Sequence, residues 1–297
     1  DVLLDASGFA FGDQHPAERT IQFAKRVEIA RKKNKKVLLL PQALGPFNKL
    51  GMREAFKQIV NATDLVFARD TSSFEYAQNV VGTRQNVYQA PDFTNLIKPQ
   101  LTINSDNSKR VSIIPNQRMI DKSENDLRAD DYITLVVKCI KIVENSGLIP
   151  VLLVHGKEDA ELAQALKTKL EDPIGIYHEE NPVILKRFIG ESHLVIGSRF
   201  HALVSALSQG VPAIGTSWSH KYEMLFSDYE CSELLISAQS TEEQIQAKIN
   251  LITGSHREKL VSGILEKCFE IEQETCVMWK RIDQLLGLDT AMSANDI

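Results

Sequence analysis

The chain has 297 residues and is 43% hydrophobic, which is enough apolar material for a large core and predicts about two domains. A net charge of -5 with 25% charged residues does not predict binding to nucleic acid, and no apolar run approaches the roughly 20 residues of a membrane span. The opening residues read as a strand and not as a signal peptide. The four cysteines show no C-x-x-C spacing, which favours reduced thiols in a cytoplasmic protein over disulfides or a metal site.

The first elements predict alternating strands and helices. A strand at residues 2–4 leads into a glycine-containing loop that ends at Asp13, and residues 17–31 have the apolar spacing of an amphipathic helix. The basic run at 31–36 follows that helix. Cations are common at helix carboxyl ends, so we interpret this run as a solvated turn and not as a membrane or polyanion patch.

Two further strands deliver polar residues to one edge of the predicted sheet. The apolar strand at 37–40 precedes Gln42 and Gly45, and the strand at 65–68 precedes Arg69 and Asp70. Open α/β folds bind ligands at the carboxyl ends of their strands. Arg69 could clamp a carboxylate or phosphate there, or it could form a surface pair with Asp70, which is also placed to cap the next helix.

A polar stretch at residues 95–110 predicts a linker before a second domain. That domain is expected to contain a strand from 111, a helix at 126–146, a strand at 149–154 that ends at His155, and a helix at 181–189. The chain has no H-E-x-x-H, G-x-G-x-x-G or P-loop motif. We therefore expect no protein-bound metal, nicotinamide or P-loop nucleotide.

Residues 193–226 form the most informative stretch, with a predicted strand, helix and strand followed by a polar loop. Ser198 is expected to cap the helix, with Arg199 and His201 in the first helical turn. The loop after the second strand carries the polar residues Ser217, Ser219, His220 and Lys221. Cationic side chains and free helix N–H groups at one point predict a site for a small, strongly anionic ligand. His201 is able to transfer a proton near neutral pH.

The tail at 257–286 is predicted to be one long helix. Its apolar residues fall on one stripe that should face a core: Leu260, Ile264, Cys268, Ile271, Trp279, Ile282 and Leu286. Residues 291–297 are expected to fray.

Several of these segments together resemble the polysaccharide pyruvyl transferase family. The resemblance rests on Gly-Ser-Arg-Phe-His-Ala-Leu at 197–203 with Lys221, on Gln-Ala-Leu-Gly-Pro at 42–46, and on Arg-Asp-Thr-Ser-Ser at 69–73. The residues Pro91-Asp92 and His155 with Glu158-Asp159 agree with it. The similarity extends over about residues 1–226.

The resemblance implies an α/β fold with two Rossmann-like domains facing a cleft, similar to GT-B glycosyltransferases. We expect the first domain and linker at 1–106 and the second domain at 107–297. The implied reaction transfers pyruvate from phosphoenolpyruvate to two hydroxyls of a sugar, forming a cyclic ketal and phosphate. Phosphoenolpyruvate is then a co-substrate, with no further cofactor, and the sugar acceptor belongs to a cell-surface polysaccharide or its precursor.

Residue roles follow from the same resemblance. The catalytic candidates are His201, Arg199 and Arg69. The donor-binding candidates are Ser198, His220, Lys221, Gln42 and Gly45. The acceptor-binding candidates are Asp13, Asp92 and His155, although a turn aspartate explains Asp13 and a turn with a helix cap explains His155 nearly as well.

Two alternatives remain open at the level of sequence. One is a GT-B glycosyltransferase that uses a nucleotide sugar, and the other is an inactive homologue that binds a sugar or a partner. Family members usually open with a strand and a Gly-Asn-x-Gly-Asp-like turn that this chain does not contain, so its own activity is a separate question. We expect a cytoplasmic protein, either free or peripheral at the inner face of the membrane. The oligomeric state is open, a homo-oligomer included.

Overall fold

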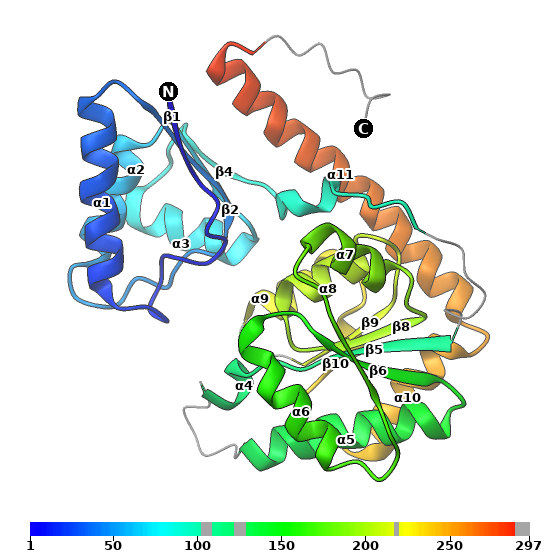
Figure 1. Cartoon of the computed structure of the whole chain (residues 1–297). Helices are drawn as coiled ribbons and strands as arrows, with labels where there is room; N and C mark the ends of the chain where they lie inside the picture. Colours follow the sequence, from blue (N-terminus) through cyan, green and yellow to red (C-terminus); the bar gives the residue numbers. More distant parts are fainter. Residues whose placement is uncertain (102–108, 122–128, 217–219, 289–297) are drawn as a thin grey trace. The chain divides into compact units, whose positions relative to one another are not determined.

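A computed structural model describes residues 1–101, 109–121, 129–216 and 220–288 (Figure 1). Its contacts group the chain into two compact units, one from Asp1–Leu96 with the residues from Ile271 onward, the other from Ile97–Glu270. Each unit has its own parallel sheet with helices packed on it.

The first unit contains a four-stranded sheet in the order β1-β2-β3-β4, with all described pairings parallel. The strands are β1 (Val2–Asp5), β2 (Lys36–Gln42), β3 (Leu65–Ala68) and β4 (Val87–Gln89). The helices between them are α1 (Ala17–Lys32), α2 (Met52–Ala62) and α3 (Thr71–Val81), and a short 3-10 helix, η1, follows at Phe93–Leu96. Strands β2 and β3 are almost entirely buried and apolar, as expected for central strands covered on both faces.

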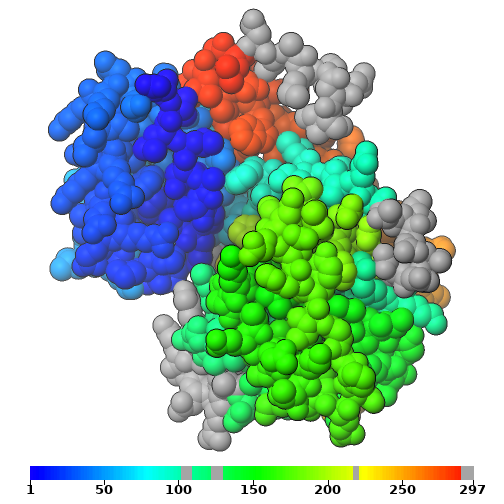
Figure 2. Space-filling model, viewed as in Figure 1, coloured from blue at the N-terminus to red at the C-terminus, as the bar shows by residue number. Residues whose placement is uncertain are grey.

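Alternate residues of these strands enter two different cores. Val37, Leu39 and Val66 pack with α1, α2 and α3 on one face, whereas Leu38 and Phe67 and their neighbours pack on the other face against α11 (Arg257–Leu286). The period of two along a strand explains this division. The edge strand β1 lies at the surface, with Val2 43% and Leu4 48% exposed (Figure 2, dark blue).

The second unit contains a six-stranded sheet in the order β10-β9-β8-β5-β6-β7, and its described pairings are parallel. The strands are β5 (Arg110–Ile114), β6 (Ile149–Val154), β7 (Gly175–His178), β8 (Leu194–Gly197), β9 (Ala213–Thr216) and β10 (Leu235–Ile236). Counted within this unit, the order is that of a Rossmann sheet, whose direction of winding reverses between its first and fourth strands. Here those strands are β5 and β8.

Helices cover both faces of this sheet (Figure 1). Helix α5 (Ala129–Asn145) packs with α10 (Glu242–Thr253) and α6 (Ala160–Thr168), whereas α7 (Pro182–Gly190) packs with α8 (Phe200–Leu207) on the other face. The remaining elements are α4 (Arg118–Asp121), the 3-10 turns η3 (Lys157–Asp159) and η4 (Ser232–Leu234), and α9 (His220–Asp228).

The predicted fold class, α/β with two Rossmann-like units, is confirmed, and the long helix begins and ends where the sequence predicts. The contacts place the second half of α11 with the first unit, because Met278 and Ile282 pack against Leu38 and Phe67. The second compact unit therefore ends at Glu270, whereas the range predicted for the second domain extends to residue 297. None of the described helices is both long enough and apolar enough to cross a membrane.

Candidate functional site

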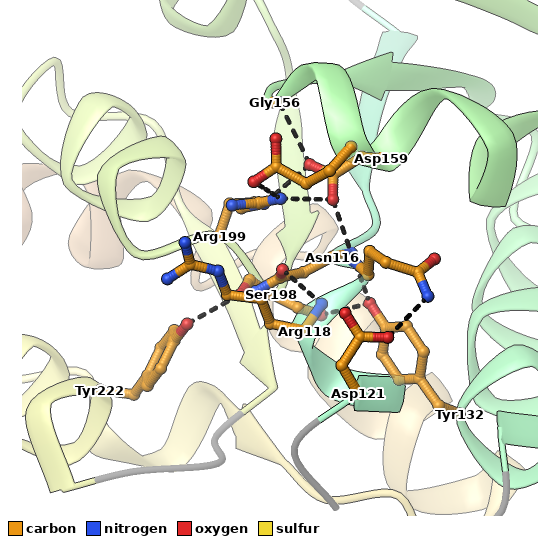
Figure 3. Close-up of polar contacts among 11 residues, drawn as sticks. Asn116, Arg118, Asp121, Tyr132, Gly156, Asp159, Ser198, Arg199 and Tyr222 are labelled. Atoms are coloured by element: carbon orange, nitrogen blue, oxygen red, sulfur yellow. Dashed lines mark hydrogen bonds and ion pairs between the residues drawn. The ribbon is translucent and has the colours of Figure 1, made fainter. Parts of the chain in front are cut away.

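The candidate site lies at the carboxyl ends of β5, β6, β8 and β9 in the second unit (Figure 3). Ile114 at the end of β5 pairs with Gly197 at the end of β8, so the turns that follow these strands start side by side. This is the point where the sheet order reverses, which is where open α/β sheets commonly bind ligands. The turns contribute Asn116 and Ser198 directly to the site.

Ser198 anchors the site to the core. The residue is 2% exposed, and its hydroxyl bonds with the hydroxyl of Tyr132 at 2.7 Å and with that of Thr216. Its carbonyl accepts hydrogen bonds from Asn116 Nδ2 and from the Tyr222 hydroxyl, both at 2.8 Å. These bonds satisfy the polar atoms of a buried turn, as a stable interior requires.

The prediction that Ser198 caps helix α8 is wrong. The N-cap residue is Arg199, and its side chain makes no capping hydrogen bond. The hydroxyl of Ser198 points instead into the network with Tyr132 and Thr216. Because Arg199 does not cap the helix, the first N–H groups of α8 are suited to an anionic ligand.

Arg199 is held by two neighbouring carboxylates. Its Nε and Nη2 donate to the two oxygens of Asp159 at 2.7 and 2.5 Å, and Nη2 lies 2.8 Å from Glu158 Oε1. Burial alone would lower the pKa of Arg199, but the hydrogen bonds and charges of both carboxylates raise it. The guanidinium therefore stays charged, and its orientation is set by the turn that follows β6.

Asp159 is the buried centre of this turn. It is 0% exposed and accepts additional hydrogen bonds from the backbone N–H groups of Gly156, at 3.1 Å, and Gln117, at 2.9 Å. A Cβ atom at Gly156 would lie 2.8 Å from Glu158 Oε2 and 3.0 Å from Arg199 Nη2, so a larger residue here would displace the Glu158 carboxylate. The turn thus links β5, β6 and β8 through one carboxylate.

Two histidines join the arginine at this point. His155 follows β6 and is partly buried, whereas His201 lies exposed in the first turn of α8. Burial, followed by the proximity of His201 and Arg199, lowers the pKa of His155 to about 4. His155 is consequently neutral at pH 7, so its ring can both donate and accept a hydrogen bond.

Lys221 lies near the same end of α8, where its ammonium group is close to two aromatic rings. Its Nζ lies 5.2 Å from the ring centroid of Phe200, the first residue of α8, and 5.4 Å from that of Tyr222. His220 and Lys221 begin helix α9 and do not lie in a loop as predicted. Ser217 and Ser219, and the side chain of His220, lie outside the described residues.

The candidates of the first unit form a separate set. Arg69 is 6% exposed and its Nη1 lies 3.5 Å from Asp92 Oδ2. Asp92 also accepts hydrogen bonds from the backbone N–H and hydroxyl of Thr94. Asp70 caps α3 by accepting from Ser73 N at 2.7 Å, which confirms its predicted capping role.

The remaining candidates of this unit also have partners. Gln42 is buried and its Nε2 donates to Asp5 Oδ2 at 3.0 Å. Asp13 accepts from the backbone N–H groups of Asn48 and Lys49, as expected for a turn aspartate. Gly45 has a φ of 75°, and a Cβ atom there would lie 2.7 Å from the Tyr76 side chain, so this position is restricted to glycine.

The structure therefore brings Arg199, His201, His155 and Lys221 around one helix end, and it pairs Arg69 with Asp92 in the other unit. Sequence reasoning missed the roles of Asp159, Asn116, Tyr132 and Tyr222. Asn116 follows a strand and Asp159 follows a His-Gly turn, so their positions carried a signal. The two tyrosines lie in helices and carried none. Within the described ranges, no group of three His, Cys, Asp or Glu side chains is placed to hold a metal ion.

The fold, with two parallel α/β sheets, is similar to that of GT-B-like glycosyltransferases and epimerases. The family model of polysaccharide pyruvyl transferases matches residues 1–220, and the chain belongs to this family. The predicted family is thereby confirmed. No curated protein sequence matches the chain.

Solved structures show the same fold at low identity. HepE from Anabaena, in complex with UDP-glucose, is 13% identical with a TM-score of 0.57, over 92% of this chain and 77% of that one. MnaA from S. aureus with UDP is 13% identical with a TM-score of 0.59, over 93% and 82%. UDP-GlcNAc 2-epimerase from Neisseria meningitidis, bound to UDP-GlcNAc, is 12% identical with a TM-score of 0.58, over 92% and 83%.

Proposed function

We propose that this chain transfers pyruvate from phosphoenolpyruvate to two hydroxyls of a sugar, with release of phosphate. The family supports this reaction class. The observation that carries the proposal is the gathering of Arg199, His201, His155 and Lys221 around the amino end of α8. A small donor with two anionic groups and a proton-dependent reaction needs this set of side chains.

The donor's anionic groups would be held by fixed positive charge. The N–H groups at the start of α8 are not capped by the side chain of Arg199, and they favour an anion through both hydrogen bonding and the helix dipole. Arg199 is already oriented by Asp159, so little conformational entropy is lost when it binds a ligand. Lys221 adds a second cation beside Phe200.

The chemistry requires two proton transfers. The donor's methylene carbon gains a proton and becomes a methyl group, while the adjacent carbon forms a bond to the first sugar hydroxyl. The second hydroxyl then replaces the phosphate on that carbon, which closes the ketal and releases inorganic phosphate. The two hydroxyl protons end on the methyl group and on phosphate, and His201 is the group that transfers them.

His155 would meet the acceptor. A neutral imidazole can accept a hydrogen bond from a sugar hydroxyl, and the lowered pKa keeps it neutral beside Arg199. The assignment of Arg69, Asp92, Asp13, Gln42 and Gly45 to donor or acceptor binding stays a prediction.

The test is a thermal-shift titration with phosphoenolpyruvate, followed by an assay of phosphate release with candidate sugar acceptors. A ligand at a hundredfold excess over its Kd stabilises the folded state by about 2.7 kcal/mol. We expect Arg199→Ala to weaken donor binding, and His201→Ala to retain donor binding but lose phosphate release. Arg187→Ala and His256→Ala, which change exposed residues of α7 and of the turn before α11, serve as matched controls.

A nucleotide sugar is the second candidate donor, since the similar folds above were solved with UDP or UDP-sugars. Stabilisation by a nucleotide sugar alone would favour glycosyl transfer. Binding of a sugar without phosphate release in any acceptor screen would favour the inactive homologue. Full phosphate release by His201→Ala would refute the role of that histidine.

A further inference from the structure

The two carboxylates that hold Arg199 differ in a way that separates their roles. The Asp159 side chain is 0% exposed and the Glu158 side chain is 50% exposed, although both contact the same Nη2 atom. A buried carboxylate cannot leave its arginine without a large cost. An exposed one can move into solvent at little cost.

Asp159 is fixed by more than its charge. Its oxygens also accept the backbone N–H groups of Gly156 and Gln117, so moving it would break bonds in two turns. It would therefore remain on Arg199 whether or not a ligand is bound.

Within the described part of the chain, the Glu158 carboxylate has no comparable bond to a neighbouring turn. This carboxylate contacts the site through Arg199 Nη2, at 2.8 Å. The pKa of Glu158 is lowered by a hydrogen bond from its own backbone and by the hydrogen bond from Arg199. The positive charge of Arg118 lowers it further. The carboxylate of Glu158 thus occupies a position in the site that favours an anion.

We infer that Glu158 holds the place of a donor anionic group on Arg199, and that the donor displaces it on binding. The inference deepens the function proposed above and rests on it. During the exchange Arg199 keeps Asp159 and replaces one carboxylate with another anion, so the guanidinium is never left unpaired. Glu158 acts as a positioning residue, because it orients Arg199 before the donor arrives and competes with the donor afterwards.

Glu158→Gln tests this exchange because it keeps the shape of the side chain and removes its charge. We expect the Kd for phosphoenolpyruvate to fall about two- to fivefold, the range that corresponds to an exposed ion pair. The KM for the donor should fall in proportion, with little change in kcat, because the competing interaction is lost before chemistry. A structural role alone would not lower KM and leave kcat unchanged.

Glu180→Gln is the matched control. Glu180 pairs with Lys157 at 2.9 Å, with side chains 68% and 81% exposed. Glu180→Gln also removes one negative charge, from the partner of Lys157, the residue that precedes Glu158. It does not alter a contact of Arg199, so the Kd for phosphoenolpyruvate should not change. Titrations with inorganic phosphate and with pyruvate show which group of the donor takes the place of Glu158.

The outcomes separate the two proposals. If phosphoenolpyruvate binds the original chain and Glu158→Gln equally, or binds Glu158→Gln more weakly than the original chain, the exchange is refuted and the proposed function stands. If phosphoenolpyruvate does not bind but phosphate, pyruvate or a nucleotide sugar binds Glu158→Gln more tightly than the original chain, the exchange stands and the function fails. If none of these ligands binds either protein, both are refuted.

Discussion

Replacing Asp159 with asparagine tests the role of the buried carboxylate at the centre of the site. Asp159 Oδ1 accepts from Gln117 N at 2.9 Å and Arg199 Nη2 at 2.5 Å, while Oδ2 accepts from Gly156 N at 3.1 Å and Arg199 Nε at 2.7 Å. Asparagine has one acceptor oxygen and one NH2 group. In either orientation its NH2 group faces two N–H donors.

The expected cost follows from these bonds. Two buried donors lose their acceptor, and each such loss costs about 1–3 kcal/mol. Breaking a buried ion pair on one side costs about 3–5 kcal/mol, so both arguments agree on a loss of about 3–5 kcal/mol. Urea unfolding of the original chain and of Asp159→Asn measures this difference in the free energy of unfolding.

Asp121→Asn is the control, because Asp121 is an exposed carboxylate that accepts from Gln117 Nε2 at 3.0 Å. It should cost less than about 0.5 kcal/mol. A double-mutant cycle with Arg199→Gln isolates the pair, and the coupling between the two sites should exceed about 1.5 kcal/mol. A cost below about 1 kcal/mol for Asp159→Asn, or additive effects in the cycle, would refute the argument that Asp159 holds Arg199.

Two further changes follow from the same network. The folded pKa of His155, about 4, lies below its ordinary value, so its contribution to stability is complete above about pH 6.5 and is lost as the pH falls towards 4. The loss in the free energy of unfolding reaches about 3 kcal/mol. Measured by urea unfolding between about pH 6.5 and about pH 4, His155→Gln should lose correspondingly less stability than the original chain. Equal losses in the variant and the original chain would contradict the prediction. Tyr132→Phe removes the hydroxyl that accepts from Asn116 N at 3.0 Å and bonds with Ser198 Oγ at 2.7 Å. It should cost about 1–3 kcal/mol by the same measurement, and a neutral effect would show that the hydroxyl is dispensable.

The residues of the site were only partly predictable from sequence. The residues Arg199, His201 and Lys221 stood out because they lie next to a glycine turn and a predicted strand. The contact of Arg199 with Glu158 and Asp159 could not be predicted, since these carboxylates are about forty residues from Arg199 in the chain and meet it only through the pairing of β5 with both β6 and β8. The predicted cap at Ser198 failed for a related reason. A hydroxyl in a turn bonds with whichever partners the neighbouring elements supply, and Tyr132 and Thr216 supplied them.

By itself the sequence determined the parallel α/β class, the bounds of most helices and strands, and the family. These depend on local apolar periodicity, on turn residues and on short motifs, all of which are contiguous in the chain. Only the tertiary structure decided that β5 and β8 are neighbours, that Asp159 is buried on Arg199, and that half of α11 packs with the first unit. The strand order and the contacts that it creates join segments far apart in the chain, and no local pattern encodes which segments will meet.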